Sequence, residues 1–457
     1  MFDKRNEVAF DIWQEVCRTI TSYKEEKQFM KRIIAVLLAV VMVLSLAACS
    51  KKDTADGGSS NSSLSDEKIE LTMWCIATES DSNRHAYEAA IADMKAKYPN
   101  IDFKWEAFEN ESYKEKIKAA MSSGAVSDIF FTWSCAFLGD FVKQDKVYCL
   151  DDVLKKYSSE IPEVMLGNTT YDGKHYGVPT TMNIVGLFAN MDILKSVGWN
   201  DVPATYEDLI KCCDALVAAG YYPFGCAGGE TWCVTEYLEP IIEKNIGAAA
   251  LNDIFLGKAS YNNEGLAKSV DILQEMINKG YFDPAGAALS NDEVKANFMA
   301  GKYAFYQNGT WNCADFAANA EFFPKVKVSE FPVIDSSKSS LGQLIGGPSD
   351  TLAVAKSSKN AAAAAEYAAE LGKLICHYGY LDGCGLPAWI PYGDTSSVNG
   401  LTQKVSEICN AANAYVLFGD TAMPAADKDI YLSYVDKVYS SSIDGKGFIA
   451  GLSKDLR

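Results

Sequence analysis

Residues 69–132 read IELTMWCIATESDSNRHAYEAAIADMKAKYPNIDFKWEAFENESYKEKIKAAMSSGAVSDIFFT, and this stretch decides the fold. Short apolar runs alternate in it with longer segments whose apolar residues recur every three or four positions, the spacing of one helix face. Gly124 stops the second of those helical segments. The expected elements are a strand at 69–76, a helix at 82–97, a strand at 101–105, a helix at 113–121 and a strand at 128–132. This β-α-β-α-β order predicts an α/β fold with a parallel sheet and helical crossovers.

The rest of the chain continues to alternate between strands and helices. Thr205 and Ser290 are each followed three residues later by an acid, Asp208 and Glu293, which is the pattern of a capped helix start. Further expected elements are strands at 183–189 and 304–307 and helices at 191–197, 205–219, 294–300 and 361–375.

Residues 30–49, MKRIIAVLLAVVMVLSLAAC, form a segment of a different kind. Two basic residues precede an apolar run at 33–44 that is shorter than the roughly 20 residues of a bilayer span. The tetrapeptide LAAC at 46–49 resembles the lipobox of bacterial lipoprotein signal peptides. The resemblance implies cleavage before Cys49 and attachment of diacylglycerol to its thiol, and therefore a lipid-anchored protein on the outer face of the cell membrane. An uncleaved transmembrane anchor is the alternative.

The segments on either side of this signal are expected to lie outside the fold. Residues 1–29 mix charged and apolar side chains ahead of a complete signal peptide that has its own methionine, Met30. We interpret 1–29 as an extension that arises from start-site choice, with a translated cytoplasmic extension as the alternative. Residues 30–48 are the expected signal peptide, and 49–67, rich in Ser, Gly, Asp and Lys, predict a flexible tether after the lipidated cysteine.

Composition bounds the remaining possibilities. The folded part of about 390 residues is longer than one hydrophobic core usually serves, which predicts two domains. A net charge of −18 and the lack of a basic stripe argue against a nucleic-acid partner. With three histidines and no CxxC pair, we expect no metal site, and we expect no cofactor. Most of the 13 cysteines lie in apolar runs, which favours buried thiols, and disulfides are the alternative in an oxidising compartment.

Five sequence pieces follow one another in a fixed order. They are SGAVSDIF at 123–130, YGVP at 176–179 with LFANMDIL at 187–194, PATYEDL at 203–209, FMAGKYA at 298–304 with NGTW at 308–311, and AVAKSSKN at 353–360. In this order the pieces resemble the extracellular solute-binding proteins of ABC importers, in the sugar-binding family that includes maltose-binding protein. Two pieces depart from the family pattern: Ser127 stands where proline is usual, and Tyr206 stands where tryptophan is usual.

The resemblance implies two α/β lobes of the periplasmic-binding-protein type, with a ligand cleft between them that closes by hinge bending. Chain crossings are expected near 179–182, 308–312 and 349–356. The expected lobes are 68–180 plus 312–352 for lobe 1 and 181–311 plus 353–457 for lobe 2. The resemblance further implies a monomer without catalytic residues, which captures a carbohydrate and delivers it to ABC permease subunits.

The chemistry of a sugar indicates which residues to seek. Its hydroxyls need polar side chains, and the C–H faces of its rings need flat aromatic side chains. Tryptophans after strands or in loops are therefore candidates, as are acids and amides near strand ends, and a glycine pair allows close backbone approach. The predicted ligand-binding residues are Trp74, Glu79, Asp81, Trp133, Asn183, Trp232, Asn308, Trp311, Gly346, Gly347 and Trp389, with Glu230 and Asp350 as further acids. Trp105 and Trp199 are interpreted as structural aromatics.

Other functions fit the sequence less well. HExxH, GxSxG and Walker A motifs are absent, and the carboxylate pair Glu111 and Glu115 lies on an expected helix, where a solvated face is the ordinary interpretation. A surface lipoprotein that captures glycans without a transporter is an alternative. A third possibility is the same fold with a peptide, polyamine or phosphate ester as its ligand.

Overall fold

The structure is a computed structural model that describes residue 64 and residues 68–456. Residues 1–29, the signal segment, Cys49 and the tether apart from Leu64 lie outside the described residues. Within the part of the chain that the structure describes, no helix is both long enough and apolar enough to cross a bilayer.

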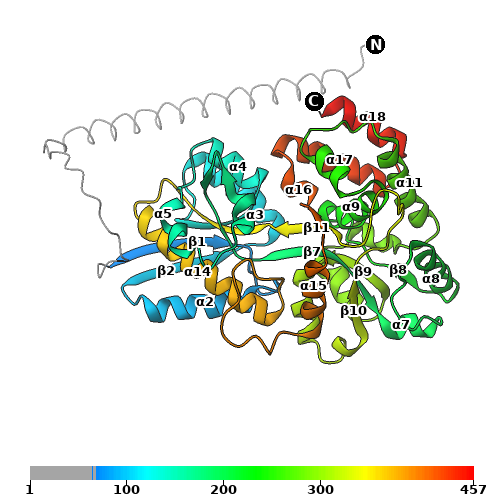
Figure 1. The fold of residues 1–457 in the computed structure, drawn as a ribbon, viewed down its shortest axis with the longest axis horizontal. Helices are drawn as coiled ribbons and strands as arrows, with labels where there is room; N and C mark the ends of the chain where they lie inside the picture. The colour runs from blue at the N-terminus through cyan, green and yellow to red at the C-terminus, as the bar shows by residue number, and fades with distance from the viewer. Residues whose placement is uncertain (1–63, 65–67, 457) are drawn as a thin grey trace, which may run out of the picture. The chain divides into compact units, whose positions relative to one another are not determined.

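Lobe 1 is built on a five-stranded sheet, at the left of Figure 1. Its strands, in spatial order, are β2 (Ile101–Ala107), β1 (Ile69–Cys75), β3 (Ile129–Trp133), β12 (Asp350–Val354) and β6 (Val178–Pro179). β1 pairs in parallel with both β2 and β3, which confirms the predicted β-α-β-α-β unit. The helices of this lobe are α2 (Arg84–Lys97), α3 (Asn110–Ser123), α4 (Ala136–Lys143), α5 (Asp151–Leu154), α6 (Glu163–Leu166) and α14 (Ala361–Asp382). α3 ends where predicted, because Gly124 adopts a φ of 73°.

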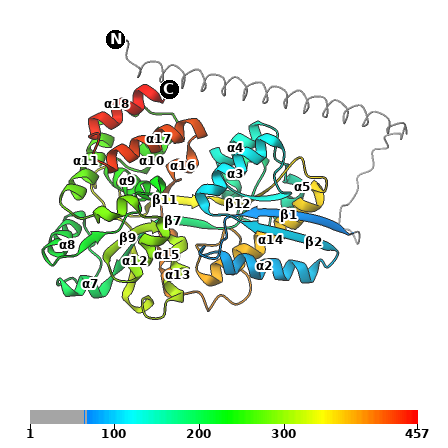
Figure 2. The same ribbon diagram turned by 180° about the vertical axis from the view of Figure 1, so that it is seen from behind.

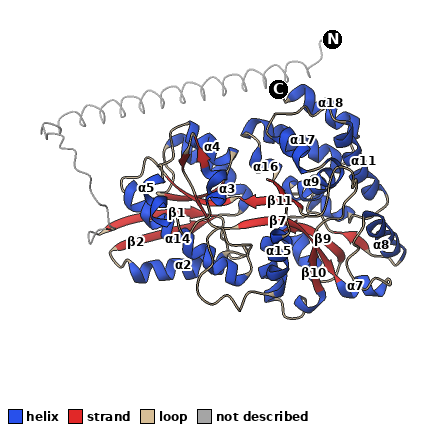
Figure 3. Ribbon diagram, in the orientation of Figure 1, coloured by secondary structure: helices blue, strands red, loops and turns tan. Residues whose placement is uncertain are grey.

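Lobe 2 is built on a six-stranded sheet around β7 (Met182–Asn190), which is buried along its whole length. The other strands are β13 (Ala414–Val416), β11 (Gln343–Pro348), β9 (Tyr303–Gly309), β8 (Tyr222–Phe224) and β10 (Val326–Ser329). The helices are α7 (Met191–Ser196), α8 (Tyr206–Ala218), α9 (Thr231–Ile246), α10 (Ala248–Phe255), α11 (Glu264–Asn278), α12 (Asn291–Met299), α13 (Cys313–Ala318), α15 (Gly400–Asn410), α16 (Gly419–Ala422), α17 (Ala425–Tyr439) and α18 (Gly445–Asp455). Figures 2 and 3 show helices flanking this sheet as well as that of lobe 1, the arrangement of an α/β protein.

Short elements complete the described fold. The Thr205 side chain accepts a hydrogen bond from the Asp208 amide at the start of α8, and Ser290 with Glu293 forms the predicted capping box of α12. The remaining elements are the β4–β5 hairpin (Thr170–Tyr171 and Lys174–His175) and the 3₁₀ turns η2 (Lys155–Tyr157), η3 (Gly167–Thr169), η4 (Pro284–Ala288), η5 (Thr310–Asn312) and η6 (Phe323–Lys325).

The chain passes between the lobes at places that differ in part from the expected ones. It crosses between β6 and β7, at 179–182 as predicted, then between β11 and β12, and again after α14. The expected crossing at 308–312 is wrong, because β9 and β10 both pair with β7. The assignment of 312–352 to lobe 1 is therefore corrected: β10 and β11 lie in the lobe 2 sheet. The assignment of 353–457 to lobe 2 is corrected for α14, whose Ala364, Tyr367 and Ala368 belong to the lobe 1 core.

The cysteines of the described residues are free thiols. Cys212 and Cys213 lie in the lobe 2 core and Cys75 in the lobe 1 core, where they act as small apolar side chains. Burial raises the pKa of the Cys75 thiol to about 12, so this thiol stays protonated. Eight of these 11 free cysteines are buried, as the sequence predicts, whereas Cys135, Cys149 and Cys409 are half-buried.

Candidate ligand-binding cleft

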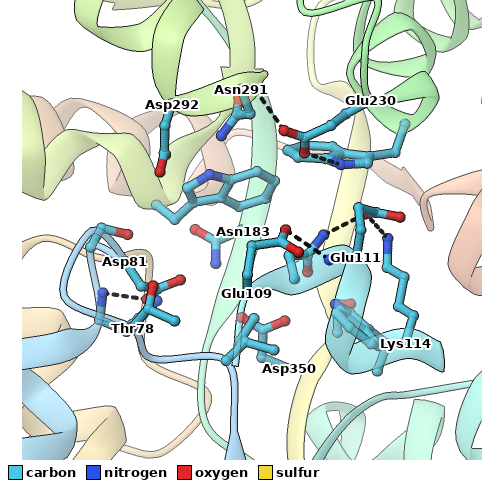
Figure 4. A pocket seen from close by; sticks show the side chains of 18 of the residues that line it. Thr78, Asp81, Glu109, Glu111, Lys114, Asn183, Glu230, Asn291, Asp292 and Asp350 are labelled. Atoms are coloured by element: carbon cyan, nitrogen blue, oxygen red, sulfur yellow. Dashed lines mark hydrogen bonds and ion pairs between the residues drawn. The ribbon is translucent and has the colours of Figure 1, made fainter. Parts of the chain in front are cut away.

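A cleft of about 500 Å³ lies between the two lobes and is lined by residues of both. Lobe 1 supplies segments that follow β1, β2 and β3, because parallel strands bring their carboxyl ends to the same edge of a sheet. Lobe 2 supplies the starts of α9 and α12 and the segment 418–421. In Figure 4, Asn291, Asp292 and Glu230 face Asp81, Glu109 and Glu111 across the cleft, with Asn183 between them.

Three tryptophans give the cleft its flat apolar surfaces. Trp133, at the end of β3, contacts the Phe131 and Phe137 rings edge-on at centroid distances of 5.0 and 5.1 Å. Trp232 and Trp311 form a tilted pair, with ring centroids 6.1 Å apart. Because all three rings are half-buried, each is held by the protein on one side and open to the cleft on another.

Gly309 makes room for the Trp311 ring. A Cβ at Gly309 would lie 2.0 Å from Cζ3 and 2.1 Å from Cη2 of Trp311. Gly309 has a φ of −64°, a backbone conformation open to any residue, so space alone requires glycine here. The ring of Phe418, 6.3 Å from that of Trp311, lies beside it.

Glu230 joins the Trp232 ring to the start of α12. One carboxyl oxygen accepts a hydrogen bond from the Trp232 indole N–H at 3.0 Å, and the other accepts one from the Asn291 amide at 2.8 Å. Burial raises the pKa of Glu230 above its ordinary range, although these two donors favour the carboxylate. Glu230 therefore orients an aromatic wall and a polar wall of the cleft together.

The first turn of α12 carries polar groups into the cleft. The Asn291 side-chain oxygen accepts hydrogen bonds from the Tyr306 hydroxyl at 2.7 Å and the Asn308 amide at 3.2 Å. Lys295 pairs with Asp315 at 2.6 Å and with Asp292 at 3.3 Å. Burial disfavours the Lys295 ammonium, but these two acids outweigh it and raise its pKa.

The lobe 1 rim is built on a loop and a helix start. The Glu109 carboxylate caps α3, accepting hydrogen bonds from the amides of Glu111 at 2.8 Å and Ser112 at 2.9 Å. Lys114 pairs with Glu111 at 2.7 Å, and its ammonium lies 5.3 Å from the centroid of the Trp133 ring. Both charges of this pair therefore stand next to an aromatic surface.

Asp81 and Asp350 form a half-buried acid pair deeper in lobe 1. Burial raises the pKa of Asp81 to about 6, against the opposing effects of the Asn83 amide and Lys295. Burial, and then the neighbouring Asp81, raise the pKa of Asp350 to about 7. A carboxyl whose pKa lies near neutrality can donate a hydrogen bond when protonated and accept one when ionised, and sugar hydroxyls can satisfy either form.

The lining also includes Asn183, Glu236 and Asp420. The Asn183 side-chain oxygen accepts a hydrogen bond from the Thr310 hydroxyl at 3.0 Å, which fixes its amide beside the crossing. Glu236 is 3% exposed, and its Oε2 atom has no hydrogen-bond partner. Asp420, on α16, accepts from the Thr421 hydroxyl at 3.2 Å.

The structure brings part of the predicted site together. The predicted residues that line the cleft are Asp81, Trp133, Asn183, Trp232 and Trp311, as well as Glu230 and Asp350. Trp74 instead packs on the lobe 1 core, with the Lys116 ammonium 4.2 Å from its ring centroid. The side chain of Glu79 is 88% exposed and pairs with Arg84 at 2.9 Å.

Four further predicted residues are buried away from the cleft lining. Trp389 is 2% exposed and donates its indole N–H to the Pro179 carbonyl at 2.8 Å. Asn308 is 1% exposed and bonds to neighbouring side chains. Gly346 and Gly347 pair with β7, and a Cβ at Gly346 would lie 2.2 Å from the Asn183 carbonyl oxygen. The close approach inferred for this glycine pair is thus to strand β7.

Several lining residues escape the sequence prediction. Glu109, Glu111 and Lys114 follow β2, so the strand-end rule that selected Trp74 and Trp133 applied to them as well. Glu111 and Glu115 are exposed on α3, as the sequence predicts, and Glu111 in addition lines the cleft. Glu236 on α9 and Asp420 on α16 carry no local signal, because an acid on a helix is ordinarily solvated.

Comparisons with known proteins agree with this architecture. The family profile described as bacterial extracellular solute-binding protein matches residues 79–372, more than half of the chain, and the chain belongs to this family. Among the described residues, no group of three or more His, Cys, Asp or Glu side chains is placed to hold a metal ion.

Individual relatives are distant in sequence and close in fold. The arabinooligosaccharide-binding protein of Bacillus subtilis is 25% identical over 279 residues, which cover 59% of this chain and 60% of that protein. The multiple sugar-binding protein of Streptococcus mutans is 23% identical over 394 residues, covering 84% of this chain and 88% of that protein. A structure from work on xylan utilization by the thermophilic bacterium Caldanaerobius polysaccharolyticus is 28% identical, with a TM-score of 0.82 over 85% of this chain and 100% of that one. The chain spans 60% of the length of several curated relatives, the Bacillus subtilis protein among them.

Proposed function

We propose that this protein captures an oligosaccharide outside the cell and delivers it to the permease of an ABC importer. The observation that carries the proposal is the cleft, in which three half-buried tryptophans alternate with amides and carboxyls from two lobes. Flat rings cover the C–H faces of sugar rings, and the polar groups between them bond to the hydroxyls. The names of the relatives, which bind arabinooligosaccharides and multiple sugars, support the same ligand class.

The lobes give the cleft a means of capture. Asp81 and Trp133 belong to lobe 1, whereas Trp232 and Trp311 belong to lobe 2. A ligand that contacts both sets is bound more tightly when the lobes close, and this difference in affinity drives closure. The same constellation offers binding groups rather than a nucleophile with its base, so we infer a binding protein and not an enzyme.

The remaining features of the proposal concern location and partners. We infer that the protein is anchored on the outer face of the cell membrane through lipid on Cys49, works as a monomer and docks on permease subunits. Metabolic labelling with palmitate tests the anchor: label on the wild type and none on Cys49→Ser supports it, and equal labelling refutes it.

A thermal-shift screen tests the ligand class. The protein from Ser50 onward, which contains both lobes, is heated with xylo-, arabino-, malto-, cello- and chitin-tetrasaccharides, and with spermidine as the rival ligand. A ligand at a hundredfold excess over Kd stabilises the folded state by about 2.7 kcal/mol. A rise in Tm with one sugar series supports the proposal, whereas a rise with spermidine alone refutes it.

Two tryptophan variants connect the screen to the cleft. Trp311→Ala is expected to abolish the sugar-induced rise in Tm, because it removes one flat face of the site. Trp199→Ala is the matched control, since Trp199 packs against the lobe 2 core and does not line the cleft. An unchanged sugar response in a folded Trp311→Ala protein would remove Trp311 from the site.

A further inference from the structure

The cleft carries a marked excess of acidic side chains. Its lining includes two basic side chains, Lys114 and Lys295, against eight acidic ones. The acids are Asp81, Glu109, Glu111, Glu230, Glu236, Asp292, Asp350 and Asp420. Both lobes contribute to this set, so a ligand in the cleft meets carboxyl groups on both sides (Figure 4).

The two lysines are already engaged by the protein. Lys114 pairs with Glu111 at 2.7 Å, and Lys295 pairs with Asp315 at 2.6 Å. Arginine, the usual bidentate partner of a carboxylate, occurs once among the described residues, as Arg84. Arg84 pairs with Glu79 at 2.9 Å and Glu88 at 2.7 Å, and it does not line the cleft. No basic group of the described lining is therefore left to receive a ligand carboxylate.

Glu236 adds an observation that points to the ligand itself. This side chain is almost fully buried, lines the cleft and leaves Oε2 without a hydrogen-bond partner. Burial, with Glu239 and Asp420 as neighbouring acids, raises its pKa well above the ordinary range. Buried polar groups in folded proteins are normally bonded, so the missing partner is expected to come from the ligand. A ligand hydroxyl or amine can supply it, and because the raised pKa keeps Glu236 protonated near neutral pH, its carboxyl can donate a hydrogen bond as well as accept one. A ligand carboxylate placed there would lie close to Asp420, the neighbouring acid.

We infer that the cleft selects oligosaccharides whose sugars are neutral or basic and excludes those that carry carboxylates, because acids of both lobes line it and both of its lysines are already paired. This inference rests on the proposed oligosaccharide-binding function and names the charge class of its ligand. Selection of this kind follows from like-charge repulsion inside a cleft of low dielectric. The repulsion lowers both the affinity and the association rate of an anionic ligand.

Matched derivatives of one sugar chain isolate the effect of charge. Each tetrasaccharide of the thermal-shift panel is reduced to its alditol, oxidised to its aldonate and converted to its 1-amino alditol, which are neutral, anionic and cationic. Kd is measured by tryptophan fluorescence for the protein from Ser50 onward, at about 20 mM and about 300 mM salt. We expect the aldonate to bind at least about tenfold more weakly than the alditol at low salt, and the amino alditol at least as tightly. The difference between the aldonate Kd and the alditol Kd should be smaller at high salt.

Variants of the lining acids test the assignment. Asp420→Asn keeps the size of the side chain, and it is expected to reduce the ratio of aldonate Kd to alditol Kd. Glu236→Gln is expected to change the alditol Kd and to leave this ratio unchanged, because burial keeps the Glu236 carboxyl protonated. Glu321→Gln is the matched control, because this acid is 91% exposed and lies outside the cleft lining, and it should leave the ratio unchanged.

The outcomes separate the two proposals. Equal affinity for alditol and aldonate in the wild type would overturn the charge selection alone and leave oligosaccharide binding in place. A ratio that changes as much in Glu321→Gln as in Asp420→Asn would also overturn it, by assigning the effect to net charge. Lack of any binding by all neutral tetrasaccharides would overturn the oligosaccharide function and the charge selection together.

Discussion

Replacement of Gly309 by alanine should displace one wall of the cleft without removing any ring from it. The added Cβ would lie 2.0 Å from Cζ3 of Trp311, whereas carbon atoms in contact sit about 3.5 Å apart, so the ring must move by about 1.5 Å. The backbone at φ −64° accepts alanine, and the ring can swing towards the open cleft. The free energy of unfolding should therefore change by only about 1 kcal/mol or less, since reduced freedom of the unfolded chain offsets part of the crowding.

The effect on binding should be larger. A well-placed aromatic side chain contributes about 2 kcal/mol or more to a binding site, so its displacement should weaken sugar binding by about 30-fold. Titration calorimetry with the tetrasaccharide that gives the largest thermal shift measures this loss. Near-UV circular dichroism reports the disturbed Trp232–Trp311 pair without any ligand. Gly400→Ala is the control, because a Cβ there meets no atom within 4 Å.

Two outcomes would refute the role given to the Trp311 ring. If Gly309→Ala folds, keeps the near-UV spectrum of the wild type and binds sugar with an unchanged Kd, then the Trp311 ring does not depend on the space above Gly309. If the spectrum changes and Kd does not, the ring moves as expected but is not part of the binding surface.

Three further predictions concern charge and stability. Asp350→Asn should raise Tm at pH 8 and not at pH 4, because burial raises the pKa of Asp350 from 3.8 to about 7. Between these two values the folded state binds more protons than the unfolded state, so the free energy of unfolding falls as pH rises. Equal shifts in Tm at both pH values would contradict this. Trp389→Phe should cost about 1–3 kcal/mol in urea unfolding, because the Pro179 carbonyl loses its donor, and should leave sugar Kd unchanged; a large change in Kd would return Trp389 to the site. Lys244→Met should cost about 3–5 kcal/mol, since it leaves buried Glu243 and half-buried Glu330 without their cation; an unchanged urea midpoint would refute that estimate.

Local signals in the sequence were sufficient for much of the fold and insufficient for its long-range pairing. The cap at Thr205 and the capping box at Ser290 are written in neighbouring residues, and both form. The lobe assignment of 312–352 failed because β10 and β11 are short strands that pair with β7, more than 100 residues earlier in the chain. Nothing in the period or composition of a short strand specifies which sheet it joins.

The residues of the cleft show the same division between local signals and long-range packing. Trp133 and Asp81 were predictable because they follow parallel strands, whose ends converge wherever the sheet forms. Trp389 follows the loop-like sequence Gly385-Leu-Pro387, but it is buried in the lobe 1 core and bonds to the Pro179 carbonyl, 210 residues earlier in the chain. Glu236 lies on a helix, and only the packing of α9 against the cleft turns it from a surface acid into a buried one.

The acids of the cleft also bear on why closure should wait for a ligand. Glu109 and Glu111 belong to lobe 1, whereas Asp292 and Asp420 belong to lobe 2, so closing the empty cleft brings like charges together. Repulsion between the lobes opposes closure, and water in the open cleft screens it. A sugar placed between the two sets replaces that repulsion with hydroxyl donors for both. The arrangement that excludes anionic ligands therefore also favours the open state in the absence of a ligand, because both effects arise from the same uncompensated carboxyl groups.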